Sequence, residues 1–224
     1  MSKGATIGCM KIHFWMVAGA VFATPGVAMG AVTQPCGTMQ RLPEILSHPL
    51  PTLPIAPPLP SGDKTEREAH GVCANVHLTD NFAIKWGNSA SIAEADVRSL
   101  ANAFEYIWEH EIDVMGHGAP WGADTYLMNV YIGDTGSCAP SAQGMAGYYT
   151  TDPDDMPMIV MASGGLNDVG YAASTAAHEF YHALQHSTGS FSAESAYWFW
   201  EATACWIEDE VYPGTSQYAT FLFG

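Results

Sequence analysis

The fold is decided by residues 169–187, whose sequence is VGYAASTAAHEFYHALQHS. Its alanines and regularly spaced apolar residues predict one continuous α-helix. Within that helix His178 and His182 are four positions apart, so both imidazoles project from the same face. Two such imidazoles can bind one metal ion, and Glu179 can reach a metal-bound water as a general base. The stretch therefore predicts a metal-binding helix with hydrolytic chemistry.

A catalytic zinc ion usually takes three protein ligands, so a third ligand is needed. His186 lies about 12 Å along the helix from His178, at about 1.5 Å per residue, whereas zinc–nitrogen bonds are about 2 Å long. We expect His186 to support another ligand or to lie at the surface, and the surface is favoured. A histidine six residues after His182 is excluded, because that position is Thr188 and the glycine turn before it is replaced by Gln185.

The remaining source is a glutamate from the next predicted helix, residues 193–211. Glu194, Glu201 and Glu208 are spaced by seven and share one face, so helical phase does not choose among them. Small neighbours around Glu201 permit two helices to approach closely. Its distance from His182 in sequence also leaves room for a turn and an antiparallel return. Both arguments favour Glu201.

The HEFYH pentapeptide is followed by Gln185, and residues 198–213 have the sequence WFWEATACWIEDEVYP. Over roughly residues 80–213 the chain resembles the gluzincin metallopeptidases. It is most similar to exported bacterial proteins whose third-ligand helix contains Trp-x-x-Glu-x-x-Ala-x-Trp-x-Glu-Asp-Glu-Val-Tyr-Pro. The resemblance implies three zinc ligands, His178, His182 and Glu201, with Glu179 as the catalytic base.

Two positions depart from that family. Thermolysin-like members place an acidic residue four positions after the third ligand to orient a metal-bound histidine, and this chain has Cys205 there. The orienting group is then expected to be Glu208 or a backbone carbonyl. Gluzincins also use a Tyr or His to stabilise the oxyanion. The candidates here are Tyr197, His186 or a residue beyond the end of the chain.

The rest of the pattern predicts an α+β fold. We expect a zincin-like domain with a small mixed sheet, one backing helix, the HExxH helix and the third-ligand helix, which Gly189 separates from the first. The backing helix is predicted at residues 91–113, and the strands at 81–86, 124–133, 147–151 and 158–162. An extended substrate is expected along a sheet edge, for which the strand near residues 158–162 is the candidate.

The N-terminus has the features of an export signal. Lys3 and Lys11 form a short basic region, residues 14–23 are apolar, and small residues precede a cleavage site before Ala31. A signal peptide over residues 1–30 predicts a secreted or periplasmic protein; an uncleaved anchor is the alternative. No later segment is long and apolar enough to cross a bilayer, so stable membrane insertion is not expected.

Residues 31–75 are predicted to be a Pro-rich extension that serves as a linker, a pro-segment or an arm. The stretch 48–60 contains six prolines, which exclude regular helix. Residues 76–224 are predicted to be the metallopeptidase domain. Since the chain stops in an apolar run at residues 221–223, we expect the domain to be truncated.

Cleavage before Ala31 would leave four cysteines, an even number that suits disulfides in an exported chain. The pairing favoured by sequence proximity joins Cys36 to Cys73 and leaves Cys138 with Cys205. Alternatively, Cys205 is a buried thiol on a helix.

The charge balance restricts the partners. Lys and Arg total 7 against 23 Asp and Glu, a net charge of −16. This sign excludes binding to phosphate backbones and suits cationic metals, cationic substrates or simple solubility. Asp152, Asp154 and Asp155 offer oxygen ligands for Ca²⁺, or they form an ordinary acidic turn.

The sequence therefore predicts a zinc-dependent endopeptidase that acts on protein or peptide substrates. Glu179 would take a proton from a zinc-activated water and pass it to the leaving amine. The alternative is a non-catalytic zincin-like binding domain that has kept the fold. Hydrolysis of a non-peptide bond at the same site is a third hypothesis.

Overall fold

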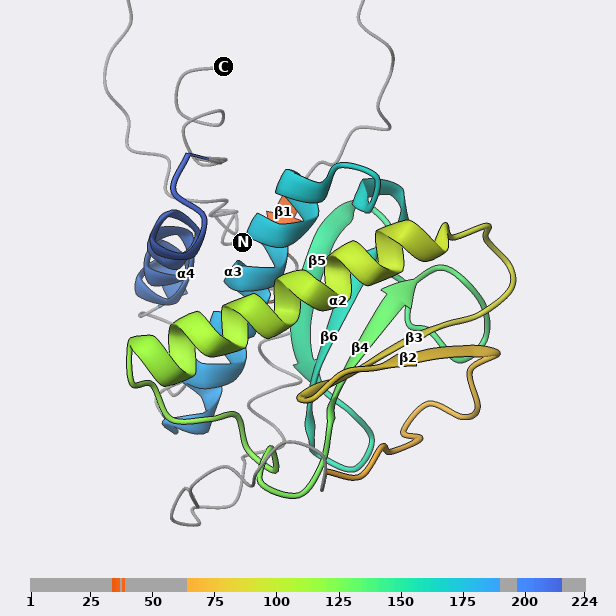
Figure 1. Cartoon of the computed structure of the whole chain (residues 1–224), viewed down its shortest axis with the longest axis horizontal. Coiled ribbons are helices and arrows are strands. Elements are labelled where there is room, and N and C mark those ends of the chain that lie inside the picture. Colours follow the sequence, from red (N-terminus) through yellow and green to blue (C-terminus); the bar gives the residue numbers. More distant parts are fainter. Residues whose placement is uncertain (1–33, 37, 39–63, 190–196, 215–224) are drawn as a thin grey trace, which may run out of the picture.

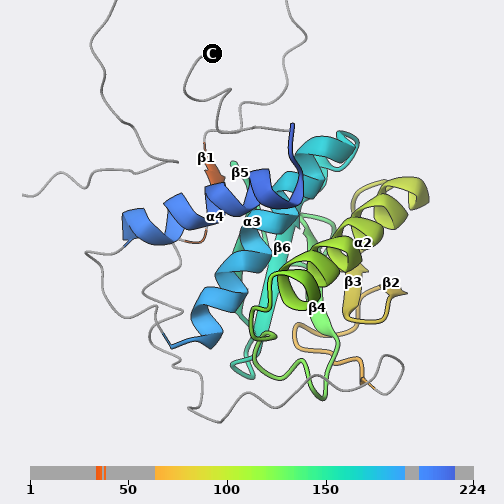
Figure 2. The ribbon, with the colours of Figure 1, turned by 60° about the vertical axis from the view of Figure 1, so that its left-hand side comes forward.

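The computed structural model describes residues 34–36, 38, 64–189 and 197–214. This part of the chain forms one mixed β-sheet with α2 and α3 on one of its faces and a third long helix packed on α3, which confirms the α+β class (Figures 1 and 2). The strands are β1 (Gln34–Cys36), β2 (Asn75–Leu78), β3 (Phe82–Trp86), β4 (Met128–Gly133), β5 (Met145–Thr151) and β6 (Pro157–Ala162). The helices are α2 (Glu94–Trp108), α3 (Val169–Ser187) and α4 (Tyr197–Val211), with a π-helical extension of α2 (Glu109–Val114) and a short 3₁₀ turn (Ser163–Gly165).

The strand order is β1-β5-β6-β4-β3-β2. The central strands β3, β4 and β6 are parallel, and β5 runs antiparallel to β6. At one end β2 pairs antiparallel with β3, and at the other β1 pairs parallel with β5. The expectation that residues 158–162 form the sheet edge was wrong, because β6 lies between β5 and β4. The edge strands of the described sheet are β1 and β2, and β1 covers the outer side of β5.

The predicted strands and helices agree with the structure to within a few residues, apart from two additions. The backing helix predicted at residues 91–113 is α2 with its π-helical extension. Strands β1 and β2 were not predicted, because each is short and lies in or beside the Pro-rich extension.

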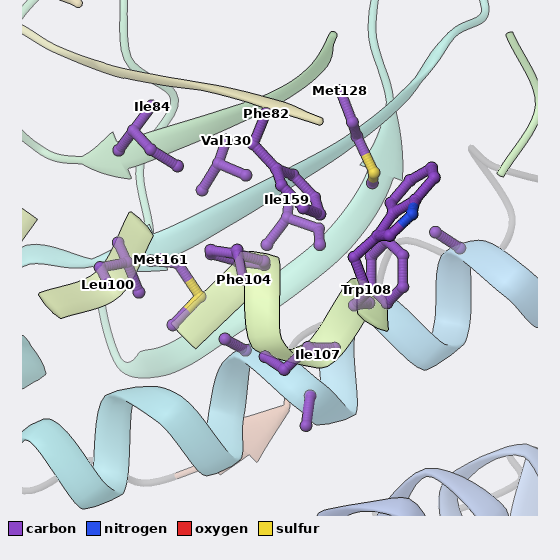
Figure 3. Packing of buried hydrophobic residues seen from close by; sticks show 14 of the residues in the cluster. Phe82, Ile84, Leu100, Phe104, Ile107, Trp108, Met128, Val130, Ile159 and Met161 are labelled. Carbon is purple, nitrogen blue, oxygen red and sulfur yellow. The ribbon is translucent and has the colours of Figure 1, made fainter. Parts of the chain in front are cut away.

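The main core lies between the sheet and the helices α2 and α3 (Figure 3). Phe82 of β3 contacts Phe104 of α2 at a ring-centroid distance of 5.0 Å and Phe180 of α3 at 5.6 Å. All three rings are fully buried. Burying a Phe side chain contributes roughly 1.5–3 kcal/mol, so these contacts fix α3 firmly against the sheet.

Helix α3 lies between the sheet and α4, as both views show (Figures 1 and 2). Its first turn is capped by Asp168, which accepts a hydrogen bond from the Tyr171 backbone N–H at 3.0 Å. Gly189 follows its C-terminus with φ of +70°, which confirms the predicted glycine stop. The small residues that precede His178 are buried, which allows α4 and the sheet to pack closely on α3.

A second, smaller core on the sheet contains Tyr131, Tyr148 and Val160 with the disulfide Cys73–Cys138. Both predicted pairings, Cys36–Cys73 and Cys138–Cys205, are therefore wrong. Cys73 precedes β2 and Cys138 follows β4, and both strands flank β3. Cys36 lies on β1 at the opposite edge of the sheet, so proximity in sequence did not reflect proximity in space.

The disulfide supports the prediction of export, since such bridges persist in oxidising compartments. Within the described residues no helix is both long enough and apolar enough to cross a bilayer.

The predicted signal peptide, most of the Pro-rich extension and the apolar run at 221–223 lie outside the described residues. Residues 64–74 do not form a free arm, since Thr65 bridges Tyr126 and Cys73 is tied to the loop after β4.

The disulfide gives a prediction about stability. Cys73 and Cys138 are 65 positions apart, and loop-closure entropy for a bridge of that span is about 4 kcal/mol. The double variant Cys73→Ser/Cys138→Ser should unfold at lower urea concentration, with a loss of about 2–4 kcal/mol in the free energy of unfolding. Equilibrium denaturation of both chains measures this loss, and equal midpoints would contradict the bridge.

Candidate metal centre

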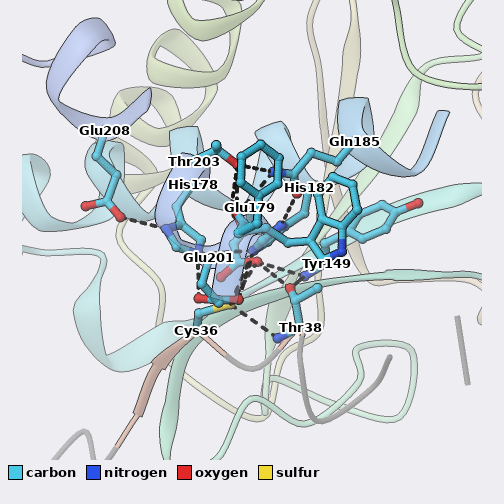
Figure 4. A network of polar contacts seen from close by, with 12 residues as sticks. Cys36, Thr38, Tyr149, His178, Glu179, His182, Gln185, Glu201, Thr203 and Glu208 are labelled. Atoms are coloured by element: carbon cyan, nitrogen blue, oxygen red, sulfur yellow. Dashed lines mark hydrogen bonds and ion pairs between the residues drawn. The ribbon is translucent and has the colours of Figure 1, made fainter. Parts of the chain in front are cut away.

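Three elements bring five side chains together at one point beside the edge of the sheet (Figure 4). Helix α3 supplies His178, Glu179 and His182, helix α4 supplies Glu201, and strand β1 supplies Cys36. The four helical residues are buried, and Cys36 is partly exposed. The arrangement depends on packing, because α3 and α4 must cross at the turn that contains the histidines.

Four of these residues offer donor atoms that lie within 4.8 Å of one another, namely Cys36, His178, His182 and Glu201. The two imidazole Nε2 atoms are 3.1 Å apart. Glu201 Oε2 lies 3.4 Å from His178 Nε2, and Glu201 Oε1 lies 3.3 Å from His182 Nε2. Cys36 Sγ is 3.6 Å from His182 Nε2 and 3.4 Å from Glu201 Oε1.

These separations fit a tetrahedral site for one ion. With bonds of about 2.0–2.1 Å to nitrogen or oxygen and about 2.3 Å to sulfur, the corners of a tetrahedron around zinc are about 3.3–3.6 Å apart. The measured separations fall in or just below this range. The donor set could therefore hold a metal without rearrangement of the backbone.

Each histidine is oriented by a hydrogen bond on its other ring nitrogen. His178 Nδ1 is 2.6 Å from Glu208 Oε1, and Glu208 in turn accepts a bond from Ser174 Oγ at 2.9 Å. His182 Nδ1 is 2.7 Å from Gln185 Oε1. Both partners are acceptors, so each Nδ1 carries a proton, and in the neutral imidazole Nε2 is the atom available to a metal ion.

The orientation of Gln185 is itself fixed by α4. Its Nε2 group donates to the Trp200 carbonyl at 3.1 Å and to Thr203 Oγ1 at 2.8 Å. The amide oxygen is therefore the atom that faces His182, and the same contacts tie α3 to α4 next to the ligands.

The electrostatics of the centre favour a cation. Burial alone would lower the pKa of both histidines, but contacts with Cys36 and Glu201 outweigh burial. The pKa of His178 is raised well above its ordinary value, and that of His182 is raised to about 10. Burial would raise the pKa of Glu201, but hydrogen bonds to the two histidines hold it well below its usual range. The donor set thus stabilises positive charge at its centre, whether protons or a metal ion supply it.

Glu179 lies next to the donor set and is fully buried. Its Oε2 atom accepts hydrogen bonds from Thr38 Oγ1 at 2.7 Å and from the Tyr149 backbone N–H of β5 at 3.0 Å. Its Oε1 atom has no hydrogen-bond partner among the described residues. Thr38 and the Tyr149 N–H therefore hold Oε2 in place, and Oε1 can still accept a proton.

The structure brings together all four residues that the sequence assigned to the site, and it places Glu208 on His178 as one of the two proposed orienting groups. Glu194 lies outside the described residues. Tyr197 is the first residue of α4, one turn before Glu201.

The expectation that His186 lies at the surface was wrong, because it is buried and Tyr149 OH lies 2.7 Å from its Nδ1. This burial lowers the pKa of His186 to about 4.

Cys36 and Thr38 are the residues that sequence reasoning missed. The even number of cysteines assigned Cys36 to a disulfide, and only the Cys73–Cys138 bridge shows that it is available as a ligand. Thr38 carries no sequence signal, since a lone threonine in a Pro-rich region has no distinctive pattern around it.

The acidic turn proposed for Ca²⁺ is explained by protein contacts. Arg67 binds Asp152 at 2.8 Å and Asp154 at 2.6 Å. The second oxygen of Asp152 accepts the backbone N–H groups of Asp154 and Met156. These carboxylates are already neutralised and hydrogen-bonded, which favours an ordinary turn over a calcium site.

The Glu208–His178 contact gives a prediction. In Glu208→Gln the hydrogen bond to Nδ1 loses its charge, so the affinity for zinc, used here as the probe metal, should fall about 10–100-fold. Competition with a chromophoric zinc chelator measures the affinity. The matched control is Glu210→Gln, an exposed carboxylate on the same helix, which should leave the affinity unchanged. An equal effect of both substitutions would contradict an orienting role for Glu208.

The profile of one protein family matches residues 63–223, and that family is described as a family of unknown function, DUF6055. Comparison with curated proteins and with solved structures gives no match. The matched range contains the site residues of α3 and α4, whereas Cys36 and Thr38 precede it. Because the match extends over well more than half of its residues, the chain belongs to the DUF6055 family, whose function is unknown.

Proposed function

We propose that this protein is a zinc-dependent peptidase of the zincin type. The observation that supports this proposal best is the meeting of His178, His182 and Glu201 donor atoms within 3.1–3.4 Å of one another, beside the buried carboxylate of Glu179. Three protein ligands from two helices, next to a carboxylate that is not needed as a ligand, are the parts of a hydrolytic zinc site.

The chemistry of the donors favours zinc. Imidazole nitrogen, carboxylate oxygen and thiolate sulfur in a tetrahedral arrangement suit Zn²⁺. Ca²⁺ and Mg²⁺ prefer six or more oxygen donors, and this centre offers oxygen from Glu201 alone among its four donor residues.

A bound zinc ion would polarise the scissile carbonyl and lower the pKa of a water ligand to about 7. Glu179 would take up a proton at Oε1, the oxygen without a partner among the described residues, and deliver it to the leaving amine. Glu208 and Gln185 would hold the two imidazoles in the required tautomer throughout. The closed packing of α3 against α4 would keep these groups in place without reorganisation.

Strand β5 supports a polypeptide as the substrate. Its outer edge passes directly beside Glu179, whose Oε2 is 3.0 Å from the Tyr149 N–H. A substrate in extended conformation could pair with this side of β5 through main-chain hydrogen bonds, in place of β1, which occupies it in the structure. Its scissile bond would then lie next to the donor set.

One observation favours the alternative of a non-catalytic binding domain. Cys36 supplies a fourth donor, and zinc sites with four protein ligands are usually structural, whereas catalytic sites keep one position open. The two hypotheses predict different effects of removing the Cys36 sulfur. A structural site would lose metal and stability, and a catalytic site would become accessible.

The zinc site itself is tested by elemental analysis of the purified chain. We expect about one tightly bound zinc per chain, as in other sites with three or four protein ligands. In Glu201→Ala the affinity should fall further than the about 10–100-fold that is typical of an outer-shell partner. Wild-type protein without zinc, or a variant with unchanged affinity, would contradict the ligand assignment.

Catalysis is tested with Glu179→Gln in a Cys36→Ala background, because the Cys36 sulfur would compete with water for the metal. Hydrolysis of casein and of a mixed peptide library should fall at least about 10²–10⁴-fold when Glu179 is replaced, while zinc stays bound. Glu210→Gln in the same background is the matched control. Full activity of the Glu179→Gln chain would exclude this mechanism, and absence of activity in the Cys36→Ala parent would favour the binding domain.

A further inference from the structure

We propose that the β1 segment, defined here as residues 34–36 and 38, is an intramolecular inhibitor that closes the metal centre with Cys36 as the fourth ligand and with Thr38 on the general base. This inference rests on the zinc peptidase proposed above. It adds a regulatory state, in which the chain holds metal but admits neither water nor substrate.

The first support is the position of β1 on the sheet. Strand β1 pairs with the outer edge of β5, with Gln34 opposite Met145 and Cys36 opposite Gly147. The other side of β5 is taken by β6. An extended substrate that adds to this edge would need the same main-chain groups that β1 uses. The segment and a substrate strand therefore compete for one place.

Gly147 explains how β1 comes so close to the ligands of α3. A side chain at this position would lie 3.1 Å from Thr175 Cγ2 of α3 and 3.1 Å from the Val160 carbonyl. Its absence lets β5 approach α3 closely, and Cys36 is the residue of β1 paired with it. The strand register thus directs the one thiol of the β1 segment to the donor set.

The second support is the contact of Cys36 with the donors. Its sulfur is 3.4 Å from Glu201 Oε1, 3.6 Å from His182 Nε2 and 3.8 Å from Glu179 Oε2. The first two separations are those expected between ligands of one tetrahedral ion. The sulfur therefore takes the fourth position, which a catalytic zinc site keeps for water.

The third support is Thr38, which engages the general base. Its hydroxyl donates to Glu179 Oε2 at 2.7 Å and accepts from the Tyr149 N–H at 2.8 Å. Thr38 is fully buried. Two residues of one short segment thus occupy the ligand position, the Oε2 atom of the Glu179 carboxylate and the Tyr149 N–H at the same time.

The segment also lies outside the range that the family match covers. The family match begins at residue 63, so it includes the two histidines, Glu179 and Glu201 but neither Cys36 nor Thr38. A ligand needed for the fold of the family would be expected within the matched range. Cys36 is also partly exposed, so that a thiol reagent can reach it.

The test uses the full chain loaded with cobalt(II), whose spectrum reports directly on sulfur ligation. Wild type and Thr38→Val should both display a sulfur-to-cobalt charge-transfer absorption, and Cys36→Ala should lack it while it still binds cobalt. Absence of this absorption in wild type would overturn the proposal. Loss of both cobalt and folded structure in Cys36→Ala would also overturn it, because Cys36 would then be a structural ligand.

Access to the metal is measured with acetohydroxamate, a small ligand that coordinates through oxygen. The tethered thiolate competes at an effective concentration of roughly millimolar or more, so Cys36→Ala should bind acetohydroxamate at least about tenfold more tightly than wild type. Equal affinities would overturn the proposal.

A measurement without mutation uses the modification of Cys36 by iodoacetamide in wild type. The rate should rise at least about tenfold when a chelator removes the metal, since the coordinated thiolate is protected. An unchanged rate would overturn the proposal.

Peptide hydrolysis separates this inference from the proposed function. If Cys36→Ala opens the site but cleaves no peptide, the inhibitor segment stands and the peptidase proposal fails. If wild type cleaves peptides as fast as Cys36→Ala, the peptidase stands and the inhibitor segment is refuted.

Discussion

The packing of α4 on α3 is the contact on which the rest of this site depends. It brings the Glu201 carboxylate within 3.4 Å of two imidazole nitrogens that belong to another helix. The same interface contains Glu208 on His178 and Gln185 between His182 and the backbone of α4. Ligands, orienting groups and the close approach of two helices are thus one structural unit. A shift of α4 by a single turn would separate all of them.

This unit brings together charges that a protein interior normally avoids. Two imidazoles whose Nε2 atoms converge and two carboxylates are buried beside a partly exposed thiol, and burial of such groups without a counter-charge is costly. A central cation removes this cost, because each donor then has a partner. The pKa values of His178 and His182 are raised because their contacts with Cys36 and Glu201 also favour positive charge. The buried donors therefore suit a site for a cation.

The sheet places the main-chain groups of β5 next to the donor set. Strand β5 packs against α3, and on its side away from β6 the Tyr149 N–H donates to Glu179, next to the donor set. This side of β5 is in turn covered by β1, so the same geometry that could present a substrate to the metal also presents Cys36 and Thr38. A substrate and the inhibitory β1 segment would therefore bind to the same side of β5. The core around Phe82 holds the sheet and α3 in register, since it joins the sheet to both packed helices.

Much of the site could be predicted from local sequence. The four-residue spacing of His178 and His182 fixes their common face on any helix, and Glu179 follows from the same pattern. The α+β class followed from the alternation of apolar patterns, and most strands were located to within a few residues. Glu201 needed more than helical phase, because Glu194 and Glu208 share its face; small neighbours and chain length were the additional arguments. These properties depend on residues near one another in sequence, and such residues constrain each other directly.

Contacts between distant segments could not be predicted in this way. The bridge between Cys73 and Cys138 depends on the adjacency of β2, β3 and β4, and the burial of His186 depends on where Tyr149 falls on β5. The position of Cys36 depends on the parallel pairing of β1 with a strand more than a hundred residues later. The sequence by itself determined that two histidines share one face of a helix and that a glutamate follows the first of them, because helix geometry is local. Only the tertiary structure decided which strand is the edge and which cysteine meets the metal site, because strand order is set by packing of the whole sheet.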